Sequence, residues 1–422
     1  MTARHRPTAV LIAHPGAELY GSDLVLLESV SALVESGTTV TVALPGDGPL
    51  VAELERRGAA TVLCRTPVLR KSILHPAGAL AFVRDALIGT VTGIGLLHRI
   101  RPDVVYVNTV TLPLWILLAR LRQVPVIAHL HEAERDAPGV IRRALATPLL
   151  LCQSVITNSD HCRNVVSETY PALSARTTVV ANPIAGPDRP APARVDLADQ
   201  LRLVYVGRLS ERKGVDVAVR AVARYRATGR PVELHLVGDV FPGYEWYLTR
   251  LHELVHAEGL DTSVFFHGYQ RNVWPFLAAS DIVLVPSILE EGFGNTAVEG
   301  TLAARPVVVS DTSGLREASA GFSSAQRVPP GDASALADAV ARIVRDWPHD
   351  RLAAATDRFV ARDRHALAGY RSAIRTAVSQ ALRPAPVPAA AAVAGRPAGR
   401  RPTHVLSSAL NEGKATWNRS TI

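Results

Sequence analysis

Residues 286–300 read PSILEEGFGNTAVEG, and this stretch decides how the chain around it folds. The residues just before it, DIVLVPS at 281–287, form an apolar run that predicts a buried strand of a parallel sheet. A glycine-punctuated loop follows at 291–294, and Asn295 is a residue type that favours the N-cap of a helix. Glu299 then falls on the same helix face as Asn295 and points back towards the loop. The stretch therefore predicts a strand–loop–helix junction.

The junction brings two kinds of binding group together. A helix N-terminus has free N–H groups that suit a phosphate, and the glycines allow a ligand to approach closely. Glu291 and Glu299 add carboxylates, which accept hydrogen bonds from sugar hydroxyls. A nucleotide sugar carries both phosphates and hydroxyls. The alternative is a plain junction with solvated glutamates, because two carboxylates eight residues apart are common by chance.

The full string EGFGNTAVEG, between the run at 281–287 and a second apolar run at 306–311, resembles the donor-site motif of family-four (group 1) retaining glycosyltransferases of the GT-B fold. The resemblance implies two Rossmann-like doubly wound parallel-sheet domains that face each other across a cleft, with a C-terminal helix crossing back to the first domain. It implies that Glu299 binds the ribose and that Glu291 holds the transferred sugar. The donor-binding residues of this stretch are then Glu291, Gly292, Phe293, Gly294, Asn295 and Glu299.

A second motif, GRLSERKG at 207–214, follows the predicted strand 201–206 and precedes a helix from Val215. Arg208 supplies a planar fork and Lys213 a point charge, so the loop suits a diphosphate, although a solvated basic loop is the alternative. The spelling resembles the family's donor-phosphate motif. It implies that Gly207, Arg208 and Lys213 bind the donor and that the two cations stabilise the leaving diphosphate.

The first half contributes a loop after its first predicted strand, residues 8–14. Gly16 and Gly21 bracket this turn, where a doubly wound sheet places its ligands, and a plain strand-to-helix loop is the alternative. The resemblance implies that the loop faces the donor diphosphate and the acceptor.

Two further strand ends carry candidates. His129 and His131 end the predicted strand 124–132, and the resemblance places the histidine of an H-E pair beside the donor sugar; His131 matches this position and His129 does not. It also implies that backbone groups near the end of the run VFFHGY hold the base, which makes Gly268 and Tyr269 candidates. The catalytic candidates are thus Glu291, His131, Arg208 and Lys213.

Strands alternating with helices along both halves predict βαβ units. A proline-rich stretch at 186–200 predicts a linker between the two domains. The chain is predicted to consist of an acceptor-side domain at 1–185, the linker, a nucleotide-sugar domain at 201–365, a crossover helix at 366–383, and a disordered basic tail at 384–422.

The apolar region 77–97 is predicted to be a core helix, with a lipid-contacting surface on the acceptor side as the alternative. The uncharged run at 104–119, which no other uncharged run exceeds in length, is shorter than the roughly 20 residues of a membrane span. Cys64, Cys152 and Cys162 form neither a disulfide framework nor a metal-type spacing. We therefore expect a cytoplasmic protein with reduced thiols that is not inserted in a membrane.

The net charge is +8 in 422 residues, and 384–422 hold five positive side chains against one acid. A basic balance indicates a phosphate-bearing partner, which is a nucleotide, a nucleic acid or an anionic membrane. Half of the excess lies in the predicted tail, so we expect no nucleic-acid partner, and a peripheral contact with the anionic inner membrane is a hypothesis.

The resemblance implies retaining transfer from a UDP- or GDP-type sugar to a saccharide or glycolipid acceptor, without a cofactor or metal, and the YGSD loop suggests cell-surface polysaccharide or glycoconjugate synthesis. The alternatives are a catalytically silent nucleotide-sugar or anionic-surface binding protein and a nicotinamide-dependent Rossmann enzyme. The latter needs a Gly-x-Gly-x-x-Gly turn, which Gly16 and Gly21 do not provide.

Overall fold

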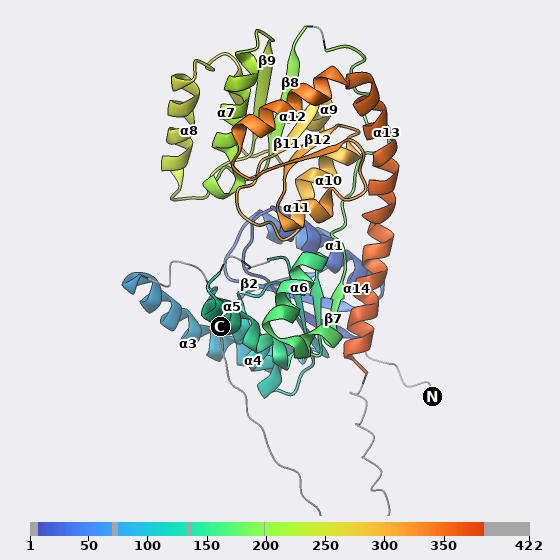
Figure 1. Cartoon of the computed structure of the whole chain (residues 1–422). Helices are drawn as coiled ribbons and strands as arrows, with labels where there is room; N and C mark the ends of the chain where they lie inside the picture. The colour runs from blue at the N-terminus through green and yellow to red at the C-terminus, as the bar shows by residue number, and fades with distance from the viewer. Residues whose placement is uncertain (1–6, 70–74, 133–134, 136, 198, 384–422) are drawn as a thin grey trace, which may run out of the picture. The chain divides into compact units, whose positions relative to one another are not determined.

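The structure, a computed structural model, describes residues 7–69, 75–132, 135, 137–197 and 199–383. Two sheets make up this part of the chain, and every strand in them pairs in parallel with its neighbours (Figure 1). Each sheet reverses its strand order next to its first strand, which is the doubly wound arrangement. The predicted fold class is confirmed.

The first sheet has seven strands, which run in spatial order β3 (Ala60–Leu63), β2 (Thr39–Leu44), β1 (Ala9–Ala13), β4 (Val104–Val107), β5 (Val126–Leu130), β6 (Ser154–Thr157) and β7 (Thr177–Val179). Its central strands β1, β4 and β5 are buried along their whole length, as their continuous apolar runs predict. The connections contain α1 (Gly21–Glu35), α2 (Pro49–Arg56), α3 (Pro76–Ile100), α4 (Pro113–Leu121), α5 (Gly139–Ala146), η2 (Thr147–Leu151), α6 (Asp160–Thr169) and η3 (Pro171–Arg176).

The second sheet has six strands, in spatial order β10 (Val264–Phe266), β9 (Val232–Val237), β8 (Leu201–Val206), β11 (Ile282–Val285), β12 (Val307–Ser310) and β13 (Ala325–Val328). Its connections contain η4 (Glu211–Lys213), α7 (Val215–Arg226), α8 (Glu245–Ala257), α9 (Trp274–Ala279), α10 (Asn295–Leu302), α11 (Ser313–Ala318) and α12 (Ala333–Arg345). Asp332 caps α12, because its carboxylate accepts hydrogen bonds from the N–H groups of Ser334 and Ala335.

The chain ends its described part with α13 (Trp347–Arg364) and α14 (Leu367–Ala381). In Figure 1 the two follow one another down one edge of the molecule, and α14 packs against α1 and β5 of the first sheet. Tyr370 Oη lies 2.6 Å from Ser29 Oγ in this interface. The predicted crossover helix is confirmed. The domain boundaries stay predictions, and the predicted tail at 384–422 lies outside the described residues.

The prediction that Asn295 is the N-cap of its helix is wrong by one residue. The helix begins with Asn295 itself, and its N-cap is Gly294 at φ 113°. Glycine takes this left-handed conformation without the Cβ clash of other residues, so it replaces the side-chain cap.

The prediction of a core helix at 77–97 is wrong for the first half of α3. Leu80, Val83, Leu87 and Val91 are more than half exposed, whereas Leu96 and Leu97 near its end are buried. Helix α3 is also long and apolar enough, by length and composition alone, to cross a membrane over Gly78–Ile100, and 22% of an apolar 18-residue window within it is buried. Arg84 and Asp85 interrupt this segment, so it does not stand out as an uncharged run in the sequence.

Candidate active site

The glycine loop after β11 holds a buried ion pair. Lys213 Nζ lies 2.7 Å from Oε1 of Glu291 and 2.8 Å from its Oε2, and the Ser287 hydroxyl donates to Glu291 Oε1 over 2.6 Å. Arg212 lies 3.7 Å from the same carboxylate. Burial by itself raises the pKa of Glu291, but the charges of Lys213 and Arg212 and the hydrogen bonds from Lys213 and Ser287 outweigh it and hold the pKa below its ordinary value. Glu291 is therefore an anion at neutral pH.

Glu299 lies one turn inside α10 and is half-buried. Burial raises its pKa to about 7, and the positive charge of Lys213 only partly opposes this rise. Lys213 thus acts on both glutamates, by direct contact with Glu291 and at a distance on Glu299. The pKa values of the two carboxylates are therefore shifted in opposite directions. Glu291 is held ionised, whereas Glu299 is close to its titration midpoint at neutral pH.

Arg208 and Lys213 contact different partners in this structure. Its guanidinium lies 3.2 Å from Glu18, 4.1 Å from the ring centre of Tyr20 and 3.1 Å from that of Phe241. Stacking of this kind favours Arg over Lys. The two cations of the predicted diphosphate clamp therefore have separate partners: Arg208 meets the loop after β1, and Lys213 meets Glu291.

The loop after β1 lies against several predicted donor-binding residues. A Cβ on Gly21 would be 3.3 Å from Asn295 Nδ2, whereas one on Gly16 would meet open space. Tyr269 donates a hydrogen bond from its hydroxyl to the Leu19 carbonyl over 3.1 Å, and its ring packs edge-on against Tyr20 at 5.6 Å.

The neighbouring Gly268 adopts a left-handed φ of 64°, and its carbonyl accepts a hydrogen bond from Gly238 N over 2.9 Å. Gly207 is likewise left-handed in φ, and its carbonyl oxygen leaves no room for a Cβ on Gly238. These glycines bring the loops after β8, β9 and β10 close to one another at the carboxyl edge of the second sheet.

His131 reaches the glycine loop through its backbone. A Cβ on Gly292 would collide with the His131 carbonyl oxygen, so only glycine allows this approach. The Gly292 carbonyl accepts a hydrogen bond from Ser159 Oγ over 2.5 Å. Phe293 beside it is buried against the His365 ring, with centres 5.4 Å apart. His131 is therefore adjacent to the loop that carries Glu291.

The structure brings Lys213, Glu291, Glu299 and the His131 backbone around one glycine loop, and places Arg208 and Tyr269 against the loop after β1. Sequence reasoning missed the partners that hold these groups, which are Glu18, Tyr20, Ser159, Arg212, Phe241 and Ser287. Arg212 lies inside the recognised basic motif and Ser287 at the end of the recognised strand, so those two had a local signal. Glu18 and Tyr20 lie in the loop that Gly16 and Gly21 bracket, whereas Ser159 and Phe241 lie in segments remote from every recognised motif.

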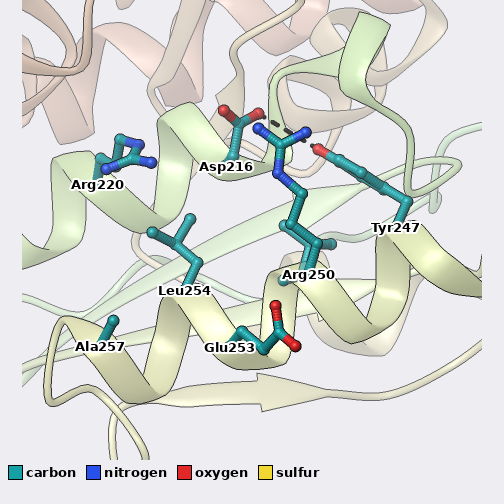
Figure 2. A pocket seen from close by; sticks show the side chains of 8 residues that line it. Asp216, Arg220, Tyr247, Arg250, Glu253, Leu254 and Ala257 are labelled. Carbon is teal, nitrogen blue, oxygen red and sulfur yellow. Dashed lines mark hydrogen bonds between the residues drawn. The ribbon is translucent and has the colours of Figure 1, made fainter.

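Two other features lie apart from this site. A cavity of about 260 Å³ opens between α7 and α8, where Arg250 and Tyr247 reach towards Asp216 (Figure 2). Its arginines are paired with acids, Arg250 with Glu211 and Arg220 with Glu258, and none of the predicted site residues lines it. Within the described residues, no group of three or more His, Cys, Asp or Glu side chains is arranged to hold a metal ion.

Solved structures define the class of protein. Anabaena HepE, solved with UDP and glucose, superposes with a TM-score of 0.74 at 20% identity over 88% of this chain and 99% of that chain. WaaG, a glycosyltransferase involved in lipopolysaccharide biosynthesis, does so with a TM-score of 0.64 at 16% identity over 87% and 99% of the two chains. The fold is that of the GT-B glycosyltransferases.

The family follows from the sequence itself. Residues 21–185 match the family described as Glycosyltransferase Family 4, and residues 200–346 match Glycosyl transferases group 1. These two regions cover most of the described residues, and the chain belongs to these glycosyltransferases, as the motifs predicted.

Curated relatives match only in part. Glycogen synthase of Mycobacterium tuberculosis (strain ATCC 25618 / H37Rv) is 29% identical over 259 residues, which is 58% of this chain and 61% of that protein. Lipopolysaccharide core biosynthesis glycosyltransferase LpsD of Rhizobium meliloti is 38% identical over 173 residues, 39% of this chain and 47% of that protein. The chain thus matches about half to three fifths of the length of these relatives.

Proposed function

We propose that the protein transfers a sugar from a nucleotide-diphosphate sugar, of UDP or GDP type, to a saccharide or glycolipid acceptor with retention of configuration. The observation that carries the proposal is the Lys213–Glu291 pair on a glycine loop, with Glu299 one turn further along α10. A cation, a fixed anion and a titratable carboxylate at one helix N-terminus match the three parts of such a donor: diphosphate, transferred sugar and ribose.

In the free protein, Lys213 is paired with Glu291. A bound donor offers Lys213 a second anionic partner. A diphosphate placed at the N-terminus of α10 competes for Lys213 and is also reached by Arg208, which has an exposed partner in Glu18. Glu291 then keeps its charge close to the anomeric carbon, where positive charge develops as the glycosidic bond breaks. Glu299 accepts the ribose hydroxyls, and Gly268 and Tyr269 hold the base.

Retention follows if the acceptor attacks from the face that the nucleotide leaves. The donor phosphate then takes the acceptor proton, so no separate protein base is required. Arg208 and Lys213 stabilise the negative charge on the departing diphosphate, which is the task that a metal ion performs in other transferases. We therefore propose a reaction without a metal or other cofactor.

The donor and acceptor classes draw support from similar proteins. HepE has been solved with UDP-glucose, and LpsD is named for lipopolysaccharide core biosynthesis. We propose work on cell-surface polysaccharide or glycoconjugate, at the cytoplasmic face of the membrane. The exposed apolar side chains of α3 support this location, because they lie on the acceptor-side half next to the exposed Arg84 and Arg99.

A donor panel scored by nucleotide release tests the proposal. UDP- and GDP-sugars are incubated with a short oligosaccharide or lipid-linked acceptor, with NAD in parallel as a thermal-shift ligand. Release of one nucleotide above the rate of a Lys213→Ala, Glu291→Gln double variant supports transfer. Binding of NAD, with no release from any nucleotide sugar, would favour the nicotinamide-dependent alternative instead.

A further inference from the structure

Four polar side chains form a continuous line of hydrogen bonds beneath the site. Asp23 Oδ1 lies 2.6 Å from His14 Nε2, Asn108 Nδ2 lies 3.0 Å from His14 Nδ1, and His131 Nε2 lies 3.0 Å from Asn108 Oδ1. Asp23 belongs to the first turn of α1. His14 directly follows β1, Asn108 directly follows β4, and His131 directly follows β5. Asp23, His14 and Asn108 are all buried.

The chemistry of these groups determines which group donates and which accepts in each of the three hydrogen bonds. The Asp23 carboxylate only accepts, so His14 Nε2 carries a proton and donates to it. The Asn108 amide nitrogen faces Nδ1 of His14, so this Nδ1 accepts a hydrogen bond from the amide N–H. The amide oxygen of Asn108 accepts from His131 Nε2–H. The proton of His131 is therefore on Nε2, and its Nδ1 is left as an acceptor.

This Nδ1 atom is buried and has no hydrogen-bond partner among the described residues. An orphaned acceptor carries a desolvation penalty, which a hydroxyl group that reaches it relieves. Burial and the neighbouring His129 and His14 hold the pKa of His131 well below its ordinary value, which keeps the ring neutral. Its backbone already touches Gly292 beside Glu291.

We propose that Asp23, His14 and Asn108 are positioning residues that fix the tautomer of His131, so that His131 Nδ1 accepts a hydrogen bond from a hydroxyl of the transferred sugar. The inference rests on the proposed function and deepens it. The resemblance places a histidine near the sugar, whereas the hydrogen-bond line assigns which ring nitrogen acts, in which direction, and which residues set it. An amine or other donor-only group on the sugar would also fit this nitrogen.

Asp23→Asn tests the direction without changing shape. Tyr20 N donates to Asp23 Oδ2 over 2.8 Å, so the new amide keeps its oxygen towards Tyr20 and turns its NH₂ towards His14. Every bond in the line then reverses, and His131 Nδ1 becomes a donor. Reversing a tautomer through an isosteric Asp→Asn change has large effects in other enzymes. We expect UDP-glucose binding to weaken about 10- to 100-fold and UDP binding to change less than about twofold.

A second substitution restores the direction. In the Asp23→Asn, Asn108→Asp double variant, the carboxylate at 108 accepts from both His14 Nδ1–H and His131 Nε2–H, so His131 Nδ1 is an acceptor again. We expect the double variant to recover at least half of the lost binding free energy. Structural damage from two buried substitutions would instead accumulate. Ser29→Ala, which removes a buried hydrogen bond of α1 outside the line, is the matched control.

Nitrogen shifts of ¹⁵N-histidine-labelled protein report the tautomer directly, with His131→Gln used to assign the ring. Protonated Nε2 in the wild type, protonated Nδ1 in Asp23→Asn, and protonated Nε2 in the double variant support the proposal. A wild-type His131 protonated on Nδ1, or no change in Asp23→Asn, overturns it. If the wild type has the expected tautomer but binds neither UDP-glucose nor GDP-mannose, the proposed function fails while the hydrogen-bond line stands.

Discussion

Replacing Glu299 with Gln should stabilise the free protein at alkaline pH while damaging the site. The pKa of Glu299 is raised from 4.5 to about 7, so the folded protein binds more protons than the unfolded chain between these values. Stability therefore falls as pH rises through this interval. At 1.36 kcal/mol per pKa unit, the ionised carboxylate costs about 3 kcal/mol at pH 8 and about 1 kcal/mol at pH 5.

Urea unfolding at both pH values measures this cost. Glu299→Gln removes the titrating group, so its gain over the wild type should be about 3 kcal/mol at pH 8 and about 1 kcal/mol at pH 5. Glu253→Gln, an exposed glutamate on α8, is the control and should change stability by less than about 0.5 kcal/mol. An equal gain at the two pH values, or none at pH 8, would refute the assignment of a carboxylate whose pKa is raised by burial.

The same carboxylate gives donor binding a pH dependence. Only the ionised form accepts both ribose hydroxyls, and the ionised share rises roughly tenfold between pH 6 and pH 8 for a pKa of about 7. UDP-glucose has no phosphate that titrates in this range, so its calorimetric Kd isolates the protein group. We expect affinity to rise about tenfold over this interval in the wild type and to stay flat in Glu299→Gln.

Three further outcomes follow from the site and the surface. Lys213→Ala and Arg208→Ala should each lower kcat by about 10²–10³, because both stabilise charge on the leaving diphosphate; Arg220→Ala is the control, and a near-normal kcat in either variant would show a wrong assignment. Leu87→Asp with Val91→Asp should reduce sedimentation with acidic vesicles at least tenfold, since burying such side chains is worth about 2 kcal/mol each, whereas Leu352→Asp on α13 should not. Truncation after residue 383 should weaken vesicle binding by about 1 kcal/mol per basic residue lost near the surface and leave turnover on a soluble acceptor intact; loss of turnover would place the tail in the fold.

Local pattern was enough to predict the strands and the two motif loops. Continuous apolar runs identified β1 and β11, because buried parallel strands have no polar face. The prediction for the first half of α3 was wrong for a related reason. An apolar helix has the same sequence whether other parts of the protein cover it or not. Which face stays uncovered depends on the neighbouring elements, and only the assembled sheet reveals it.

The contacts that hold the site could not be predicted from spacing. Lys213 and Glu291 are 78 residues apart, and His14 and Asn108 are 94 apart. Each residue lies close to a strand's carboxyl end, so the topology predicts that these residues share an edge but not which of them touch. The pairing of Lys213 with Glu291, and that of Arg208 with Glu18, depend on side-chain directions that no local rule fixes.

The most direct test of the donor site compares Glu291→Gln with Glu299→Ala, using steady-state kinetics beside a calorimetric Kd for the free nucleotide diphosphate. Glu291→Gln keeps the shape and removes the charge, so kcat should fall while the diphosphate binds as before or more tightly, because Lys213 is released. Glu299→Ala should raise the donor KM and weaken diphosphate binding, since its contact is nearly the same in ground and transition states. Loss of diphosphate binding in Glu291→Gln together with a pure kcat loss in Glu299→Ala would reverse the two roles, and no change in either variant would show that the donor binds elsewhere.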